Sequence, residues 1–323
     1  MLISGSGLFT VIAALAFDAL IGDPEWLWRR LGHPVSLIGA LIDTLDRKFN
    51  REDQSPQQRR SAGIASTAVL VVVTGSVGAL IQAATAQLPM GNILLALIAS
   101  IFIAQRSLYQ HVDEVRSAFA QAGLTEAREA VAMIVGRDPE NLDEAGVCRA
   151  AIESCAENFS DGVVAPVFWL ALLGLPGLIA YKAINTADSM IGHRTERYGS
   201  FGFAAARLDD LVNLIPARLS SLLLAVAAPI AGGSIGKAFA VVRRDASKHR
   251  SPNAGWPESA MAGALGLALA GPRRYAQYSV DDPFLNAEAT HNTTPDDIGR
   301  ALDLYTGACV IEAAIYAALA LVV

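Results

Sequence analysis

Long apolar runs separated by polar stretches are the strongest constraint on how this sequence folds. Residues 2–22, 62–86 and 301–323 each have about the length and apolar character needed to cross a bilayer. Three further apolar segments are shorter or are interrupted by proline, namely residues 92–104, 163–180 and 214–235. Because lipid offers no hydrogen-bond partner to an exposed backbone, segments that cross a membrane are expected to be helical.

The composition supports a membrane protein. The chain is 53% hydrophobic and only 17% charged, with a mean hydropathy of +0.38, whereas soluble domains are about 25% charged. We therefore predict a single membrane-embedded domain over residues 1–323, all-α and polytopic, with about four to six membrane segments. Some of these segments are expected to be interrupted or re-entrant, and cytoplasmic amphipathic helices are expected beside them.

Charge, cysteine and histidine content exclude several classes of function. A net charge of −6 and a pI near 5.4 argue against binding to nucleic acid. Cys148, Cys155 and Cys309 are too few and too scattered for a disulfide framework or a zinc site, and are expected to be reduced and packed. The five histidines lie far apart in the sequence, so no transition-metal site is predicted.

A helical section at residues 105–161, predicted to be cytoplasmic, ends in an unusual polar sequence. Its last residues belong to ENFSDGVVAPVFW, which places Glu157, Asn158 and Asp161 directly before a proline-interrupted apolar segment. Interrupted membrane helices are where membrane proteins often build sites, because the freed backbone must line a cavity. The alternative is an ordinary helix cap at the membrane surface.

The densest group of polar residues lies at 181–220. On helices, residues three and four apart share a face. One predicted face carries Asn185, Asp188 and Ser189, and another carries Asp209 or Asp210 with Asn213. A basic, glycine-containing turn between them holds His193, Arg194 and Arg197, and Pro216 is expected to stop or kink the second helix. Acids beside arginines suit a magnesium-bound polyphosphate, although ion pairs in a solvated loop would give the same pattern.

A second polar section covers residues 243–278. Lys248, His249 and Arg250 precede the turn sequence SPNAGWPE, and these cations could bind phosphate. The alternative is a basic loop that follows the positive-inside tendency of membrane proteins.

The predicted topology contains a conflict. Six straight crossings from an external N-terminus would put residues 185–210 outside, although the arginines there favour the cytoplasm. We therefore expect the proline-broken segments at 163–180 and 214–231 to form a re-entrant or half-inserted pair, which returns residues 185–210 to the cytoplasmic side.

Three sequence blocks resemble a known family. They are ENFSDGVVAPVFW, YKAINTADSMIGHRTERYGSFGFAAARLDDLVNLIPARL and KHRSPNAGWPESAMAGALG. In this order they resemble the adenosylcobinamide-phosphate synthase family of cobalamin biosynthesis, the CobD/CbiB type, over nearly the whole chain. The resemblance implies an inner-membrane enzyme with its site facing the cytoplasm. Such an enzyme would use ATP and Mg²⁺ to join adenosylcobyric acid to (R)-1-aminopropan-2-ol or its O-phosphate through an amide bond.

Amide ligation assigns candidate roles to residues in these blocks. The candidate magnesium ligands are Asp161, Asp188, Asp209 and Asp210, of which Asp188 is also a catalytic candidate. The candidate phosphate-binding cations are Lys182, Arg194, Arg197, Arg207 and Arg218, with Lys248, His249 and Arg250 for a second phosphate. Asn158, Asn185, Ser189, Asn213, Ser251 and Asn253 would orient amides or phosphates. The first candidate for the general base is His193 and the second is Glu157, while His193 could equally contact a phosphate or the backbone.

Two other classes of function stay open at this point. Charged residues at broken membrane helices also fit a transporter of a small solute or ion. A membrane scaffold for other corrin-pathway enzymes would explain the amphipathic helices, but it would leave the acid and arginine clusters without a role.

Overall fold

The computed structural model describes residues 5–135, 139–274, 279–280 and 282–323, and it is almost entirely helical. Within these residues, five helical stretches are long and apolar enough to cross a membrane: Pro56–Thr85, Gly91–Gln121, Glu144–Ile191, Leu214–Ala231 and Pro295–Ala320. A shorter apolar helix covers Gly7–Ile21. The predicted fold class, an all-α polytopic membrane protein, is confirmed.

The chain divides into two compact units, each assembled from segments that are distant in sequence. Unit 1 comprises residues 1–104, 165–213 and 316–323, and unit 2 comprises residues 105–164 and 214–315. One boundary falls inside the polar section at residues 181–220, whereas residues 243–278 lie wholly in unit 2, so the candidate site residues are distributed over both units. The expectation of one domain over the whole chain stays a prediction.

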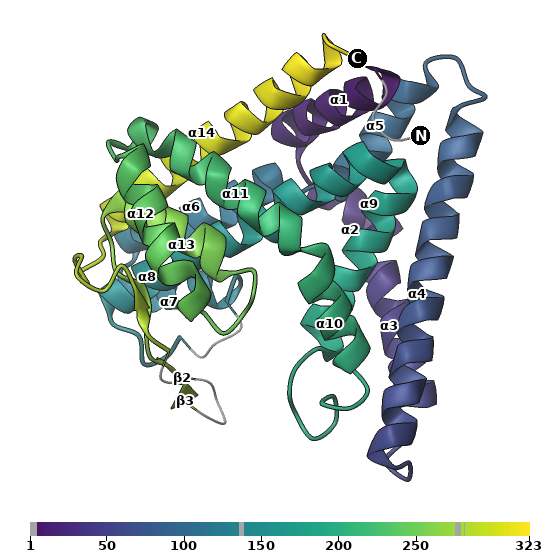
Figure 1. Cartoon of the computed structure of the whole chain (residues 1–323), viewed down its shortest axis with the longest axis horizontal. Coiled ribbons are helices and arrows are strands. Elements are labelled where there is room, and N and C mark those ends of the chain that lie inside the picture. Colours follow the sequence, from purple (N-terminus) through teal and green to yellow (C-terminus); the bar gives the residue numbers. More distant parts are fainter. Residues whose placement is uncertain (1–4, 136–138, 275–278, 281) are drawn as a thin grey trace. The chain divides into compact units, whose positions relative to one another are not determined.

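Unit 1 is built around a long helix, α4 (Pro56–Thr85), which lies beside α9 (Ala165–Ile191) and α10 (Phe203–Val212) (Figure 1). Its other helices are α1 (Gly5–Ile21), α2 (Glu25–Leu31), α3 (Pro34–Phe49) and α5 (Gly91–Ser100). The sequence SPQQ sets the start of α4. Ser55 and Gln58 form a reciprocal capping box, and Pro56 occupies the first turn, where its missing N–H costs nothing.

The predicted interruption in the fourth apolar segment lies within α9. Gly174 has φ 71° and ψ −159°, a conformation that favours glycine, and Pro176 follows two residues later. Gln82 Oε1 on α4 accepts a 2.8 Å hydrogen bond from the N–H of Leu175 and so satisfies the backbone at the break. A Cβ added to Gly78 would lie 2.7 Å from Pro176 Cα, so α4 and α9 approach closely there.

Unit 2 contains two helical groups and most of the last helix. The first group is α6 (Gln105–Gln121), α7 (Leu124–Ala132), α8 (Glu144–Phe159) and the π-helical turn η1 (Ser160–Val164). The second is α11 (Leu214–Ala227), η2 (Ala228–Ala231), α12 (Ile235–Asp245), η3 (Ala246–Lys248) and α13 (Gly255–Leu265). The helices α6, α7 and α8 lie within the section predicted at residues 105–161, and the cytoplasmic location of that section stays a prediction.

Two short antiparallel strand pairs and α14 (Pro295–Ala320) complete unit 2. β1 (Leu269–Ala270) pairs with β4 (Phe284–Leu285), and β2 (Arg273–Arg274) pairs with β3 (Ser279–Val280). Tyr305 on α14 donates a 2.7 Å hydrogen bond from its hydroxyl to the carbonyl of Gln105, and its ring packs edge-on against Phe159. These contacts fasten α14 to α6 and α8.

The expected effect of Pro216 is corrected by the structure. α10 ends at Val212 with Asn213 as its C-cap, and Pro216 lies in the first turn of α11. Proline is tolerated in a first turn because the N–H it lacks would have no partner within the helix. The separation of the two helices therefore occurs at Asn213, not at Pro216.

Candidate functional site

The end of α9 and the helix α10 bring the two predicted polar faces together within unit 1. Asn185 Nδ2 donates a 3.4 Å hydrogen bond to Asp209 Oδ1, and the Tyr181 hydroxyl donates a 3.0 Å hydrogen bond to Asn213 Oδ1. Asp209 and Asn213 are both buried. Helical spacing alone predicts each face, and the structure adds that the faces are in contact.

Like charges meet at this contact. Burial and the charge of Asp188 raise the pKa of Asp209 to about 7, although hydrogen bonds from Asn185 and Asn213 act in the opposite direction. Burial also raises the pKa of Asp210, while the charges of Arg207 and Arg194 lower it. Arg207 lies 3.5 Å from Asp210. Asp188 and Asp209 are two carboxyl groups in a partly desolvated site, where ionising both at once is unfavourable. The pair is therefore stabilised when one of them is protonated or when a cation binds to them.

His193 and Arg194 follow α9 in the loop at residues 192–202. Gly192 is the first residue of this loop, and a Cβ on it would overlap both the carboxylate and the backbone carbonyl of Asp188, so the chain can turn here only without a side chain. The imidazole of His193 interacts electrostatically with Asp188, which lies on the last turn of α9. Lys182, Asn185 and Ser189 lie on the preceding turns of α9, and the Ser189 hydroxyl donates to the carbonyl of Asn185 at 3.0 Å.

Arg197, in the same loop, is engaged in a network with α3 and α4. Its guanidinium donates a 2.6 Å hydrogen bond to Asp46 Oδ2, and its carbonyl accepts from Asn50 at 3.2 Å and from Arg59. Asn50 Nδ2 also donates to Asp46 Oδ1 at 2.7 Å, and Arg59 Nε donates to Asn50 Oδ1 at 2.7 Å. Arg197 therefore has a structural partner, and its predicted contact with phosphate stays a prediction.

The residues around the ENFSDG sequence belong to unit 2. Asn158 donates to the carbonyl and hydroxyl of Ser154, at 2.9 and 3.1 Å. Glu157 is exposed near the end of α8, and Asp161 lies in the π-helical turn η1. Turns of this kind are often found at functional sites. The helix continues through this turn into α9, so the sequence is not a helix cap.

Most of the predicted cations of unit 2 have partners there. Lys248 lies 2.7 Å from Asp245, and Arg250 lies 3.6 Å from Asp282. His249 Nε2 lies 3.8 Å from Glu258, and both side chains are buried. The Ser251 hydroxyl accepts from the backbone N–H groups of Asn253 and Ala254, at 3.2 Å each, just before α13 begins.

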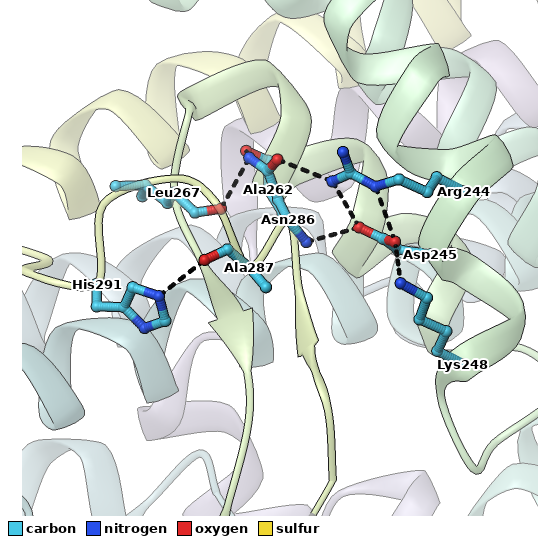
Figure 2. A network of polar contacts seen from close by, with 8 residues as sticks. All are labelled: Arg244, Asp245, Lys248, Ala262, Leu267, Asn286, Ala287 and His291. Carbon is cyan, nitrogen blue, oxygen red and sulfur yellow. Dashed lines mark hydrogen bonds and ion pairs between the residues drawn. The ribbon is translucent and has the colours of Figure 1, made fainter.

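Asp245 is the centre of a polar network that the sequence analysis missed. Figure 2 shows Arg244 and Lys248 converging on its carboxylate, with the backbone N–H of Asn286 donating at 2.8 Å. Asn286 in turn donates to the carbonyls of Ala262 and Leu267, at 3.2 Å each. Although burial raises the pKa of Asp245, these hydrogen bonds hold it well below its usual range. The network joins α12, η3 and α13 to Asn286, the residue that follows β4.

The candidate magnesium ligands do not form one group within a single unit. Asp188, Asp209 and Asp210 lie in unit 1, and Asp161 lies in unit 2. Within the described residues, no three histidine, cysteine or acidic side chains are grouped so that they could hold a metal ion by themselves. The three cysteines are buried and form no disulfide, as expected.

Comparison with known proteins identifies the family. The family model described as CobD/Cbib protein matches residues 11–305. A "Cobalamin biosynthesis protein CobD" from Sinorhizobium sp is 49% identical over 98% of both chains, and one from Rhizobium meliloti is 47% identical over 97% of both. One from Rhodobacter capsulatus is 49% identical over 91% of both. No solved structure gives a significant match. The chain therefore belongs to the CobD/Cbib family of cobalamin biosynthesis.

Proposed function

We propose that this protein is an ATP-dependent ligase that joins the carboxylate of adenosylcobyric acid to the amine of (R)-1-aminopropan-2-ol or its O-phosphate. Membership of a cobalamin-biosynthesis family supports the pathway. The observation that carries the reaction type is the contact between α9 and α10, where the half-buried Asp188 acts on the buried Asp209 and Asn185 donates to Asp209. The charges of Arg194 and Arg207 act on the adjacent Asp210. This combination suits a polyphosphate and a hard cation.

The residues present fit magnesium as part of a nucleotide complex. Protein sites for Mg²⁺ commonly supply one or two carboxylates and take the remaining ligands from water and phosphate oxygens. Asp188 and Asp209 supply such a pair, and their mutual repulsion is the feature that a cation would relieve. Asp210 is a third candidate. When bound, the metal would neutralise charge on the phosphate oxygens of ATP.

The chain itself would orient the reactants and move one proton. Arg194 and Arg207 would bind phosphate oxygens while the substrate carboxylate attacks the γ-phosphorus, which releases ADP and leaves an acyl phosphate. The amine then attacks the acyl carbon, and the C–O bond to phosphate breaks. The nitrogen must lose a proton, and His193, beside Asp188, is the first candidate to accept it. Glu157 stays the second candidate.

An inner-membrane location with the site facing the cytoplasm is part of this proposal, because ATP is a cytoplasmic substrate. The five apolar helical stretches support the membrane location. Contact with other corrin-pathway enzymes would let a large intermediate pass between active sites.

The test is direct synthesis by the purified, detergent-solubilised chain. Adenosylcobyric acid, aminopropanol phosphate, ATP and Mg²⁺ are supplied, and the amide is detected by mass. Asp188→Asn should abolish product while ADP release falls in parallel. Asp53→Asn, at an exposed acid that pairs with Arg51 outside the candidate spans, is the matched control and should retain activity.

Two results would contradict the proposal. Product formation that does not require ATP would exclude ligation through an acyl phosphate. Solute uptake into proteoliposomes by a correctly folded protein that makes no amide would favour the transporter.

A further inference from the structure

Arg218 on α11 has surroundings unlike those of the other candidate cations of unit 2. One terminal nitrogen of its guanidinium donates two 2.9 Å hydrogen bonds, to the carbonyl of Leu214 and to Asn253 Oδ1. The guanidinium carbon lies 4.4 Å from the centre of the Trp256 ring. Both hydrogen bonds use the same nitrogen, so the guanidinium is fixed in place while its remaining N–H donors stay available on its edge.

No carboxylate offsets the charge of Arg218 among the residues that the structure describes. Lys248 and Arg250 differ in this respect, because Asp245 and Asp282 lie beside them. Arg218 is also half-buried in a stretch, Leu214–Ala231, that is apolar enough to cross a membrane. Ionisable side chains are rare in such segments because burying them is costly, and those present commonly mark substrate sites.

We propose that Arg218, held by Asn253 and Trp256, binds the phosphate group of a small phosphomonoester substrate. A guanidinium stacked on an aromatic ring keeps its edge free for two parallel hydrogen bonds to phosphate oxygens. This inference rests on the proposed function, in which the amine substrate carries such a phosphate. It selects Arg218 over Lys248 and Arg250 as the phosphate contact in unit 2.

Binding without turnover tests the inference. The full chain in detergent is titrated with aminopropanol phosphate in the absence of ATP, and the Kd is measured by isothermal titration calorimetry or by equilibrium dialysis. Arg218→Gln should weaken binding at least about tenfold. Asn253→Asp should weaken binding to a similar extent, because the new carboxylate neutralises the charge of the Arg218 guanidinium. The thermal unfolding midpoint of this variant should equal that of the wild type. Arg243→Gln, at an exposed arginine of α12, is the matched control and should bind as the wild type does.

Kinetics then identify which phosphate is bound. Arg218→Gln should raise the KM for aminopropanol phosphate at least about tenfold and change the KM for unphosphorylated aminopropanol and for ATP less than about twofold. Wild-type affinity in both Arg218→Gln and Asn253→Asp would overturn the inference. A raised KM for ATP alone would overturn it too, since the nucleotide would then be the ligand. If the wild type binds aminopropanol phosphate through Arg218 but makes no amide, the ligase proposal fails and this inference stands.

Discussion

Gln82 on α4 and Leu175 on α9 are 93 residues apart in sequence and are joined by a 2.8 Å hydrogen bond from the Leu175 N–H to Gln82 Oε1. The bond lies where Gly174 departs from helical geometry and Pro176 supplies no N–H donor. A backbone group freed inside an apolar segment must find a partner in the protein, because lipid offers none. Gln82 therefore stabilises the break in α9.

Replacing Gln82 by Met keeps the length of the side chain and removes the acceptor. The N–H of Leu175 would then be left without its partner, and we expect a loss of about 1–3 kcal/mol in the free energy of unfolding. Denaturant unfolding in detergent measures it. Gln87→Met, at an exposed glutamine just beyond α4, is the control and should change stability little. Equal stability of Gln82→Met and wild type would contradict this role for the hydrogen bond.

The break itself could be predicted from sequence, but its partner could not. Glycine and proline have backbone requirements that are local, so Gly174 and Pro176 indicate an interruption wherever the helix lies. Gln82 is an unremarkable polar residue in an apolar helix until α4 packs against α9. The close approach at Gly78 is likewise a property of the packed pair.

Asp46 and Arg197 should be energetically coupled. Asp46 is buried on α3, and Arg197 is its 2.6 Å partner in the loop that also carries His193 and Arg194. A double-mutant cycle of Asp46→Asn and Arg197→Gln is expected to give a coupling energy of about 1–2 kcal/mol, because Arg197 is partly exposed and solvent weakens the pair. Thermal unfolding in detergent supplies the four stabilities, and additive losses would contradict the coupling.

The candidate site shows the same division between local and long-range information. Helical spacing predicts which residues share a face, so the grouping of Asn185 with Asp188 and of Asp209 with Asn213 follows from the sequence. Ion-pair partners are different. The contact of Arg197 with Asp46 could not be predicted, because the two residues are 151 positions apart in sequence. The partner of Lys248 could have been found, because Asp245 lies three residues earlier on one helical turn.

The Asp245 carboxylate should make the free energy of unfolding depend on pH. Burial raises its pKa, but the stronger opposing effect of hydrogen bonds from Arg244, Lys248 and the Asn286 backbone holds that pKa below the unfolded value of about 4. A carboxyl whose pKa is lower in the folded state stabilises the fold above the unfolded value, and the contribution is lost as pH falls through the folded value. The stability gap between wild type and Asp245→Asn should thus be largest at neutral pH.

Thermal unfolding of both proteins between pH 7 and pH 3 gives the difference in their free energies of unfolding. This difference should be about 1–3 kcal/mol at pH 7 and should shrink below pH 4. Asp53→Asn, at an exposed acid, is the control for general acid effects. A gap that stays constant over the whole range would show that the carboxylate's charge is not what stabilises the network.

Asp209→Asn should separate stability from activity. Burial and the neighbouring charge of Asp188 oppose ionisation of Asp209, so without a cation the charged pair strains the contact between α9 and α10. Asparagine keeps the shape and the hydrogen bond with Asn185 after its amide rotates, and removes one of the two charges. We expect the metal-free variant to be more stable by about 1 kcal/mol and ligation to fall at least about 100-fold. Unfolding in the presence of a chelator and amide synthesis with Mg²⁺ are measured on the same preparation. If Asp209 only packed between α9 and α10, the variant would be no more stable than the wild type and would retain its turnover. A carboxylate pair that binds a cation instead requires a gain in stability together with a loss of product.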